Sequence, residues 1–276
     1  MSDPAAAGPS PYTSVEGLHI HRDGPVLTFE VDRPTKRNAL TDPIVAAMIG
    51  ALSAAGPDES VRVVVIRGAG DNFCAGFDIV GRNAGDERPR VGSIQRRLPT
   101  EAHRLMELLL TTQTPVVCRV QGWAAGIGLH VALAADFAVV DEAARLWEPY
   151  AQRGFTPDTG GTWLLPRRIG EVRARAMLLL GEAVSGADAA AWGMVHRAVP
   201  AEALDGEVEQ LVGRLAEAPT VTVGLTKWLL HAGGTASLRE HLHNEALAME
   251  LSSRSDDFKE GLAAFVEKRP PQFKGR

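Results

Sequence analysis

The segment at residues 73–79 reads Phe-Cys-Ala-Gly-Phe-Asp-Ile, and its small residues leave backbone N–H groups uncovered by side chains. Such donors bind phosphate or stabilise an oxyanion that forms during a reaction. A β-branched run at residues 61–67 and a polar turn at residues 68–72 precede it, which is typical of the end of a buried parallel strand. Ligands of open α/β folds bind at such ends. Taken alone, the heptapeptide fits a tight turn with a packing glycine equally well.

Two further turns carry residues that can do chemistry. Residues 121–130 read Gln-Gly-Trp-Ala-Ala-Gly-Ile-Gly-Leu-His, follow a strand-like run at residues 116–120, and continue as an apolar, buried helix to residue 135. His130 in that helix is either a satisfied core histidine or an acid/base group that works near pH 7. Residues 157–162 form a third turn, in which Asp158 suits a helix cap or an Asx turn.

Alternating strands and helices must position these turns. The patterns predict strands at residues 25–31, 61–67, 116–120, 136–140 and 195–199, and helices at residues 42–55, 101–110, 127–135, 163–169 and from 201 to about 268. Residues 81–99 are polar and Arg-rich and are expected to form a mobile surface segment. We therefore expect a disordered tail at residues 1–14, an α/β core at residues 15–200 and a helical C-terminal region at residues 201–276.

Composition excludes several function classes. The formal net charge of −5 gives no global basic field for nucleic acid or anionic lipid. No apolar run is long enough to span a bilayer, so we expect no membrane partner. Cys74 and Cys118 lack the spacing of a metal site and are expected to be reduced thiols in a cytoplasmic protein. No His, Asp and Cys cluster has ligand spacing, so no metal is expected.

Several segments, taken in order, resemble the enoyl-CoA hydratase/isomerase (crotonase) superfamily. They stand at residues 33–40, 74–79, 122–128, 157–167, 189–195 and 260–268, and the resemblance extends from about residue 16 to residue 275. It implies a spiral of ββα turns and a helical C-terminal region that assembles homotrimers or dimers of trimers. It also implies an acyl-CoA thioester substrate, with coenzyme A as part of that substrate and no further cofactor.

The resemblance assigns the oxyanion hole to the backbone N–H groups of Phe77 and Ile127. Ile127 departs from the family, which usually has glycine there; isoleucine disfavours positive φ and is expected to narrow the pocket. Lys36 and Arg37 match the loop that lies along CoA, and Phe265 and Lys268 match a helix that reaches a neighbour's adenine and phosphate in relatives. The other positions matched to the substrate and CoA site are Ala39, Ala75, Gly76, Asp78, Ile79, Trp123, Gly126 and Tyr150.

The acid/base residues depart from the hydratase pattern. The two glutamates of the hydratases correspond to His130 and Tyr150. Glu148, two residues before Tyr150, is an alternative catalytic carboxylate, although its register differs from that of the family. Asp158 matches the aspartate of the family's isomerases, and one carboxylate can move a proton between two carbons. We therefore expect double-bond isomerisation, with Asp158 as proton shuttle and His130 as a second candidate acid/base group.

Two alternatives stay open. Asp158, His103 and Phe77 also match 4-chlorobenzoyl-CoA dehalogenase, in which an aspartate forms an ester that an activated water hydrolyses. The missing glutamates are also compatible with a subunit that binds CoA thioesters without catalysis. The acyl group and the pathway, in fatty acid or aromatic acid metabolism, stay undefined.

Overall fold

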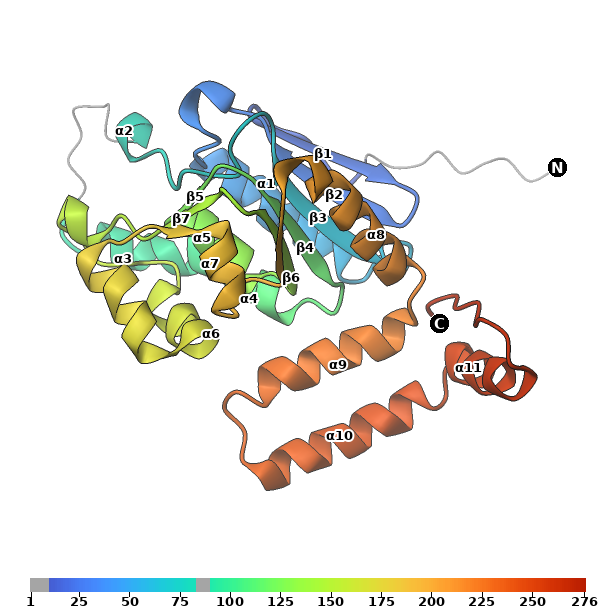
Figure 1. Ribbon diagram of the computed structural model, residues 1–276. Helices are drawn as coiled ribbons and strands as arrows, with labels where there is room; N and C mark the ends of the chain where they lie inside the picture. Colours follow the sequence, from blue (N-terminus) through green and yellow to red (C-terminus); the bar gives the residue numbers. More distant parts are fainter. Residues whose placement is uncertain (1–9, 83–89) are drawn as a thin grey trace.

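A six-stranded sheet forms the centre of the molecule. The computed structural model describes residues 10–82 and 90–276 (Figure 1), so residues 1–9 of the expected tail and residues 83–89 of the expected mobile segment lie outside the described residues. Strand β1 runs antiparallel to β2, and the other neighbours are parallel. The strands, in sheet order, are β1 (Leu18–Asp23), β2 (Val26–Val31), β3 (Val63–Gly68), β4 (Val116–Val120), β6 (Phe137–Asp141) and β9 (Arg197–Val199).

The parallel strands are apolar on both faces because helices cover both. Val63, Val117 and Val139 point to one face, where Leu204 and Val208 of helix α8 (Leu204–Ala216) pack on them. Alternate residues of the same strands point into the larger core, which contains α1 (Asp42–Ala55), α4 (Ala102–Thr111) and α5 (Ile127–Ala134). A strand buried on both faces has no polar alternation, which explains the continuous β-branched runs.

A second, smaller sheet creates the spiral. It contains β5 (Trp123–Ala125), β7 (Arg145–Trp147) and β8 (Val184–Ser185). The chain passes from β4 to β5 and α5, and then from β6 to β7 and α6 (Gly161–Arg175), so each turn adds one strand to each sheet and one helix. The predicted spiral of ββα turns is confirmed.

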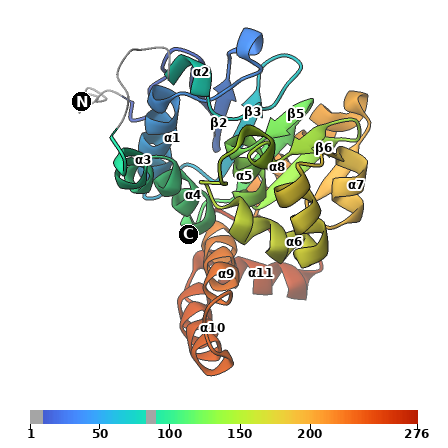
Figure 2. The same cartoon turned by 90° about the vertical axis from the view of Figure 1, so that its left-hand side faces the viewer.

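The last three helices extend away from the sheets. Figures 1 and 2 show α9 (Thr220–Ala232), α10 (Leu238–Ser252) and α11 (Asp256–Glu267) beyond the α/β body. Lys227 anchors α9: its Nζ donates to the Leu109 carbonyl at 3.0 Å, the Thr114 carbonyl at 3.3 Å and Asp136 Oδ2 at 2.7 Å. Burial lowers the pKa of Lys227, and the Asp136 carboxylate opposes that effect. In the described part of the chain, no helix has the length and apolar character that a membrane crossing needs.

Some local predictions differ from the structure. Strand β1 was not expected, although its buried Leu18 and Ile20 alternate with the exposed His19 and His21. Part of the segment expected to be a mobile loop instead forms helix α3 (Ser93–Arg97). Helix α7 (Gly186–Ala191) begins after Ser185, whose Oγ accepts a hydrogen bond from the Asp188 N–H at 3.1 Å.

Candidate active site

Backbone hydrogen bonds hold the two Gly-rich turns against each other. The Cys74 N–H donates to the Trp123 carbonyl and the Ala125 N–H donates to the Cys74 carbonyl, both at 2.9 Å. Gly128 has no room for a side chain, because a Cβ there would lie 2.5 Å from the Cys74 carbonyl oxygen. The start of α5 therefore packs directly on the segment at residues 73–79.

Both expected oxyanion donors have free N–H groups. On the side away from α5, the Leu40 N–H donates to the Gly76 carbonyl and the Asp78 N–H donates to Leu40, each at 2.8 Å, so the intervening Phe77 N–H faces the other way. Ile127 is the first residue of α5, where helical N–H groups lack an intrahelical acceptor. Within residues 10–82 and 90–276, neither N–H donates a hydrogen bond.

The expected conformational strain at Ile127 was wrong. The positive φ belongs to Gly126, at 52°, while Ile127 lies in the helix and is absent from the residues with positive φ. Its side chain is 3% exposed and belongs to the main core. The isoleucine therefore packs the helix with its side chain and leaves its N–H available, so it does not narrow the site as expected.

The loop at residues 33–40 is held by polar contacts that the sequence pattern did not reveal. Asn38 is fully buried, and its Nδ2 donates to the Ala69 and Asn72 carbonyls at 2.8 and 2.6 Å. Arg33 donates to Asp78 Oδ2 at 2.9 Å, and Asp78 Oδ1 accepts from the Gly81 N–H at 2.9 Å. These contacts lower the pKa of Asp78, the Gly81 N–H having the larger effect.

Asp78 was expected to contact CoA. In the structure its two carboxylate oxygens bond to Arg33 and to the Gly81 N–H, and so hold the segment at residues 73–79 (the oxyanion loop, named for its expected role). Lys36 and Arg37 of the same loop are exposed, as a phosphate contact requires, and Ala39 is half-buried beside them. A hollow of about 480 Å³ opens next to Phe77 and is lined by Arg33, Asp78 and Arg82 among others. Its volume is in the range of ligand sites.

Asp158 lies in the turn before α6, with contacts on two sides. The Tyr150 hydroxyl donates to its Oδ1 at 3.2 Å. His103 of α4 donates from Nε2 to the Asp158 backbone carbonyl at 2.7 Å. His103 is therefore near Asp158, as the dehalogenase pattern requires, but this ring nitrogen is occupied by the backbone. The Asp158 side chain is half-buried.

His130 and Glu148 form a buried pair behind Asp158. His130 Nε2 lies 2.8 Å from Glu148 Oε1, and both side chains are 0% exposed. His130 Nδ1 hydrogen-bonds to the Thr159 hydroxyl, which is also buried. Thr159 was not among the predicted site residues, because a threonine after Asp158 has the pattern of an ordinary turn residue.

Tyr150 connects this pair to Asp158. Its ring is parallel to the His130 ring, with centroids 5.9 Å apart, and Phe155 meets it edge-on at 5.2 Å. Burial raises the pKa of the Tyr150 phenol far above its usual value, and the nearby Asp158 carboxylate adds to the rise. A hydrogen bond with the Thr159 side chain opposes it. The phenol therefore stays protonated and donates to Asp158.

The remaining predicted residues lie in three places. Ala75, Gly76 and Ile79 flank Phe77 at the oxyanion loop, and Trp123 lies on β5, where its ring meets Trp147 edge-on at 5.6 Å. Phe265 and Lys268 lie at the end of α11, both exposed. Figures 1 and 2 both show α11 far from α2 (Ile79–Arg82), so these two residues do not join the site of their own chain.

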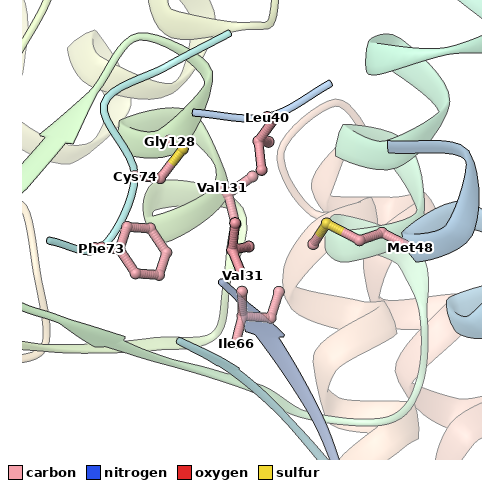
Figure 3. A pocket seen from close by; sticks show the side chains of 8 residues that line it. All are labelled: Val31, Leu40, Met48, Ile66, Phe73, Cys74, Gly128 and Val131. Carbon is pink, nitrogen blue, oxygen red and sulfur yellow. The ribbon is translucent and has the colours of Figure 1, made fainter. Parts of the chain in front are cut away.

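The cavity beneath the oxyanion loop is too small for a ligand. It measures about 10 Å³, and Figure 3 shows Cys74, Leu40 and Met48 among the apolar residues around it. Burial raises the pKa of the Cys74 thiol to about 11, so this cysteine is not a nucleophile at neutral pH. Among the residues the structure describes, no three His, Cys, Asp or Glu side chains are grouped to hold a metal ion.

Comparisons with known proteins identify the family of the chain. A family model described as enoyl-CoA hydratase/isomerase matches residues 21–276. The chain is 36% identical over 265 residues to 1,2-epoxyphenylacetyl-CoA isomerase of Escherichia coli K12, covering 95% of this chain and 100% of that protein. It is 31% identical over 259 residues to 2,3-dehydroadipyl-CoA hydratase of the same strain, covering 94% and 99%. The crystal structure of enoyl-CoA hydratase from Bacillus anthracis superposes with a TM-score of 0.87 at 28% identity, covering 94% of this chain and 100% of that one. The chain belongs to the enoyl-CoA hydratase/isomerase family of acyl-CoA enzymes.

Proposed function

We propose that the protein moves a carbon–carbon double bond in an acyl-CoA thioester, with Asp158 as the proton shuttle. One observation carries this proposal. The two positions where the family's hydratases have glutamate are occupied by His130 and Tyr150, while the Asp158 carboxylate accepts the Tyr150 hydroxyl at 3.2 Å. Hydration needs two groups to activate and deliver water, whereas a double-bond shift needs one base that later acts as an acid.

In the proposed reaction, the thioester carbonyl accepts hydrogen bonds from the Phe77 and Ile127 N–H groups. Asp158 removes a proton from one carbon, and the electron pair moves into the carbonyl to form an enolate. The enolate oxygen is stabilised by the two N–H donors. Removing one such donor from comparable sites costs about 3–4 kcal/mol of transition-state stabilisation. Asp158 then returns the proton to a different carbon, so that no atom is gained or lost.

The named relatives support an isomerase without deciding the substrate. One relative, from E. coli, is a 1,2-epoxyphenylacetyl-CoA isomerase, and another, from Streptococcus mutans, is a trans-2-decenoyl-[acyl-carrier-protein] isomerase. Others are hydratases. The proposal for this chain is therefore restricted to isomerisation of an unsaturated acyl-CoA.

The aspartyl-ester alternative is less well supported. It requires His103 to activate water at the Asp158 ester, and His103 Nε2 already donates to the Asp158 backbone carbonyl at 2.7 Å. Repeated turnover in ¹⁸O-labelled water distinguishes the two reactions. We expect no label in the Asp158 carboxylate, whereas an ester mechanism introduces it.

We further propose that the protein assembles as a homotrimer or a dimer of trimers in which α11 completes a neighbour's CoA site. Apolar side chains remain exposed on α10 and α11, including Met249, Leu262 and Phe265, the last 83% exposed. Sedimentation equilibrium should give a mass of three or six chains. A monomer at micromolar concentration would exclude this assembly.

Asp158→Asn tests the reaction. Ultraviolet absorbance reports conversion of 3-enoyl-CoA thioesters to conjugated 2-enoyl-CoA products. General-base removal costs about 10²–10⁴-fold in kcat, and we expect a loss in that range with thioester binding unchanged. Glu142→Gln, which changes an exposed carboxylate, is the matched control and should keep full activity.

Full activity of Asp158→Asn would remove Asp158 from the mechanism. If the wild-type protein binds enoyl-CoA thioesters but converts none of a panel of them, the protein is a binding subunit.

A further inference from the structure

The side chains of Glu148, His130 and Thr159 form a buried hydrogen-bond network next to Asp158. Glu148 Oε1 bonds to His130 Nε2 at 2.8 Å, and His130 Nδ1 bonds to the Thr159 hydroxyl. Glu148 and His130 are 0% exposed, and Thr159 is 2% exposed. Burying ionisable groups is costly unless they are paired, so a network of this kind usually has a role that apolar packing cannot fill.

The network has little freedom to move. Gly161 lies against it, and a Cβ at that position would be 2.3 Å from His130 Nε2 and 3.1 Å from Glu148 Oε1. The Tyr150 ring stacks parallel to the imidazole, at an angle of 6°. Both ring nitrogens of His130 are occupied, so its orientation is fixed by hydrogen bonds as well as by packing.

Burial of the Glu148 carboxylate also costs folding free energy. Its Oε2 is buried and has no hydrogen-bond partner among the described residues. An unpaired buried acceptor typically destabilises a fold by about 1–3 kcal/mol. Glutamine would offer His130 the same carbonyl acceptor without a buried charge, so the carboxylate itself is the costly feature. Such an unfavourable group in an otherwise well-packed core points to function.

Contacts from three directions meet at Asp158. Its carboxylate accepts from Tyr150, its backbone carbonyl accepts from His103, and the side chain of the next residue, Thr159, is held by His130. These partners come from different parts of the spiral: His103 from α4, His130 from α5 and Tyr150 from the segment after β7. Asp158 lies on a turn. A side chain on a turn is held in one position only where contacts from neighbouring residues fix it.

We propose that Glu148, His130 and Thr159 are positioning residues that hold the Asp158 carboxylate between the two carbons that exchange a proton. This inference rests on the proposed isomerase function. It assigns His130 a role through Thr159 and not a direct exchange of protons with the substrate. A fixed Asp158 returns the proton it removed, whereas a displaced one exchanges that proton with water before returning it.

The test measures kcat, KM and the fraction of substrate deuterium that the product retains. The substrate is a 3-enoyl-CoA thioester deuterated at the α carbon. We expect Thr159→Val to lower kcat about 10–100-fold, as a shift of about 1 Å does in other active sites, with KM changed less than about twofold. Retention should fall in the same variant. Glu148→Gln should show the same pattern, more weakly.

Two controls separate positioning from folding. Thr159→Ser keeps the hydroxyl and should restore both kcat and retention, and Thr156→Val changes an exposed threonine of the same segment and should change neither. Retention is a ratio within each turnover, so it does not depend on how much of the enzyme is folded. A lower kcat with wild-type retention in Thr159→Val would therefore indicate a folding defect and overturn the proposal.

The outcomes also separate this inference from the proposed function. If Asp158→Asn is inactive while Thr159→Val and Glu148→Gln match wild type, the isomerase function stands and the positioning network is wrong. If His130→Gln alone abolishes turnover, His130 acts directly and the network is again wrong. If Asp158→Asn is active, both proposals fail, because the network then has no shuttle to position.

Discussion

Gly161→Ala is expected to destabilise the protein much more than a glycine-to-alanine substitution at a helix position with space for a methyl group. The new Cβ would lie 2.3 Å from His130 Nε2, well inside normal van der Waals contact. His130 cannot move aside without losing its bond to Glu148 at 2.8 Å or its bond to Thr159. The methyl group therefore breaks a hydrogen bond between two side chains that are both 0% exposed.

The magnitude follows from that displacement. Leaving a buried hydrogen-bonding group without its partner costs about 1–3 kcal/mol, and overpacking costs about 1–3 kcal/mol as well. Alanine's better helix propensity returns less than about 1 kcal/mol. We expect the free energy of unfolding to fall by about 3 kcal/mol, measured by urea denaturation at one protomer concentration, since oligomer stability depends on concentration.

Two comparisons make the result specific. Gly206→Ala in α8 meets no atom within 4 Å and should be neutral or slightly stabilising. In a His130→Ala background the clash is absent, so Gly161→Ala should cost much less there, giving a coupling energy of about 2 kcal/mol or more. Additive effects of the two substitutions, or wild-type stability of Gly161→Ala, would refute the contact between Gly161 and the His130–Glu148 pair.

Two further predictions concern groups outside this network. Tyr12 donates to Asp58 Oδ2 at 2.6 Å. Burial, and to a lesser extent this hydrogen bond, raise the pKa of Tyr12 from the usual 10.0 to about 12. Because the pKa of Tyr150 is raised as well, neither of the chain's two tyrosines should give phenolate absorbance near pH 10. The stabilisation that Tyr12 contributes is present below pH 10 and is lost as pH rises towards about 12. The difference in unfolding free energy between wild type and Tyr12→Phe should therefore disappear over that range. An increase of phenolate absorbance near pH 10 in the folded protein would contradict this. The thiols of Cys74 and Cys118 are buried, and burial raises the pKa of both. A disulfide reagent at pH 8 should therefore label neither cysteine in the folded protein and both in urea. Rapid labelling of the folded protein would contradict this and show that the core opens.

Much of the core was predictable because burial leaves a clear pattern. The β-branched runs of β3 and β4 and the apolar helix α5 were all expected near their observed bounds. Strands β5, β7 and β8 were missed because they have only two or three residues each, too few for alternation to appear. Their pairing depends on partners distant in sequence, as between Trp123 and Arg145.

The site was predictable in its backbone part and less so in its side chains. Small residues mark the two turns that contain the Phe77 and Ile127 N–H groups, and glycine is needed at position 126 for its positive φ. The partners of Asp158 leave no such pattern. Thr159, His130 and Glu148 have ordinary residue types in their own segments. They meet only because α5, which contains His130, packs against the segment between β7 and α6, which contains Glu148 and Thr159.

The ladder of hydrogen bonds around Cys74 has a consequence for how the family's sequences can diverge. The Phe77 and Ile127 amides are placed by main-chain bonds between Cys74, Trp123 and Ala125. The spacing of these two amides is therefore a property of strand register, and it is independent of the side chains at either position. The side chains at positions 77 and 127 can therefore serve packing, as Ile127 does in the core, without moving the two proposed oxyanion donors. Side-chain substitutions at these two positions should thus report volume and shape preferences. They would not measure the contribution that the proposed function assigns to the two backbone N–H groups.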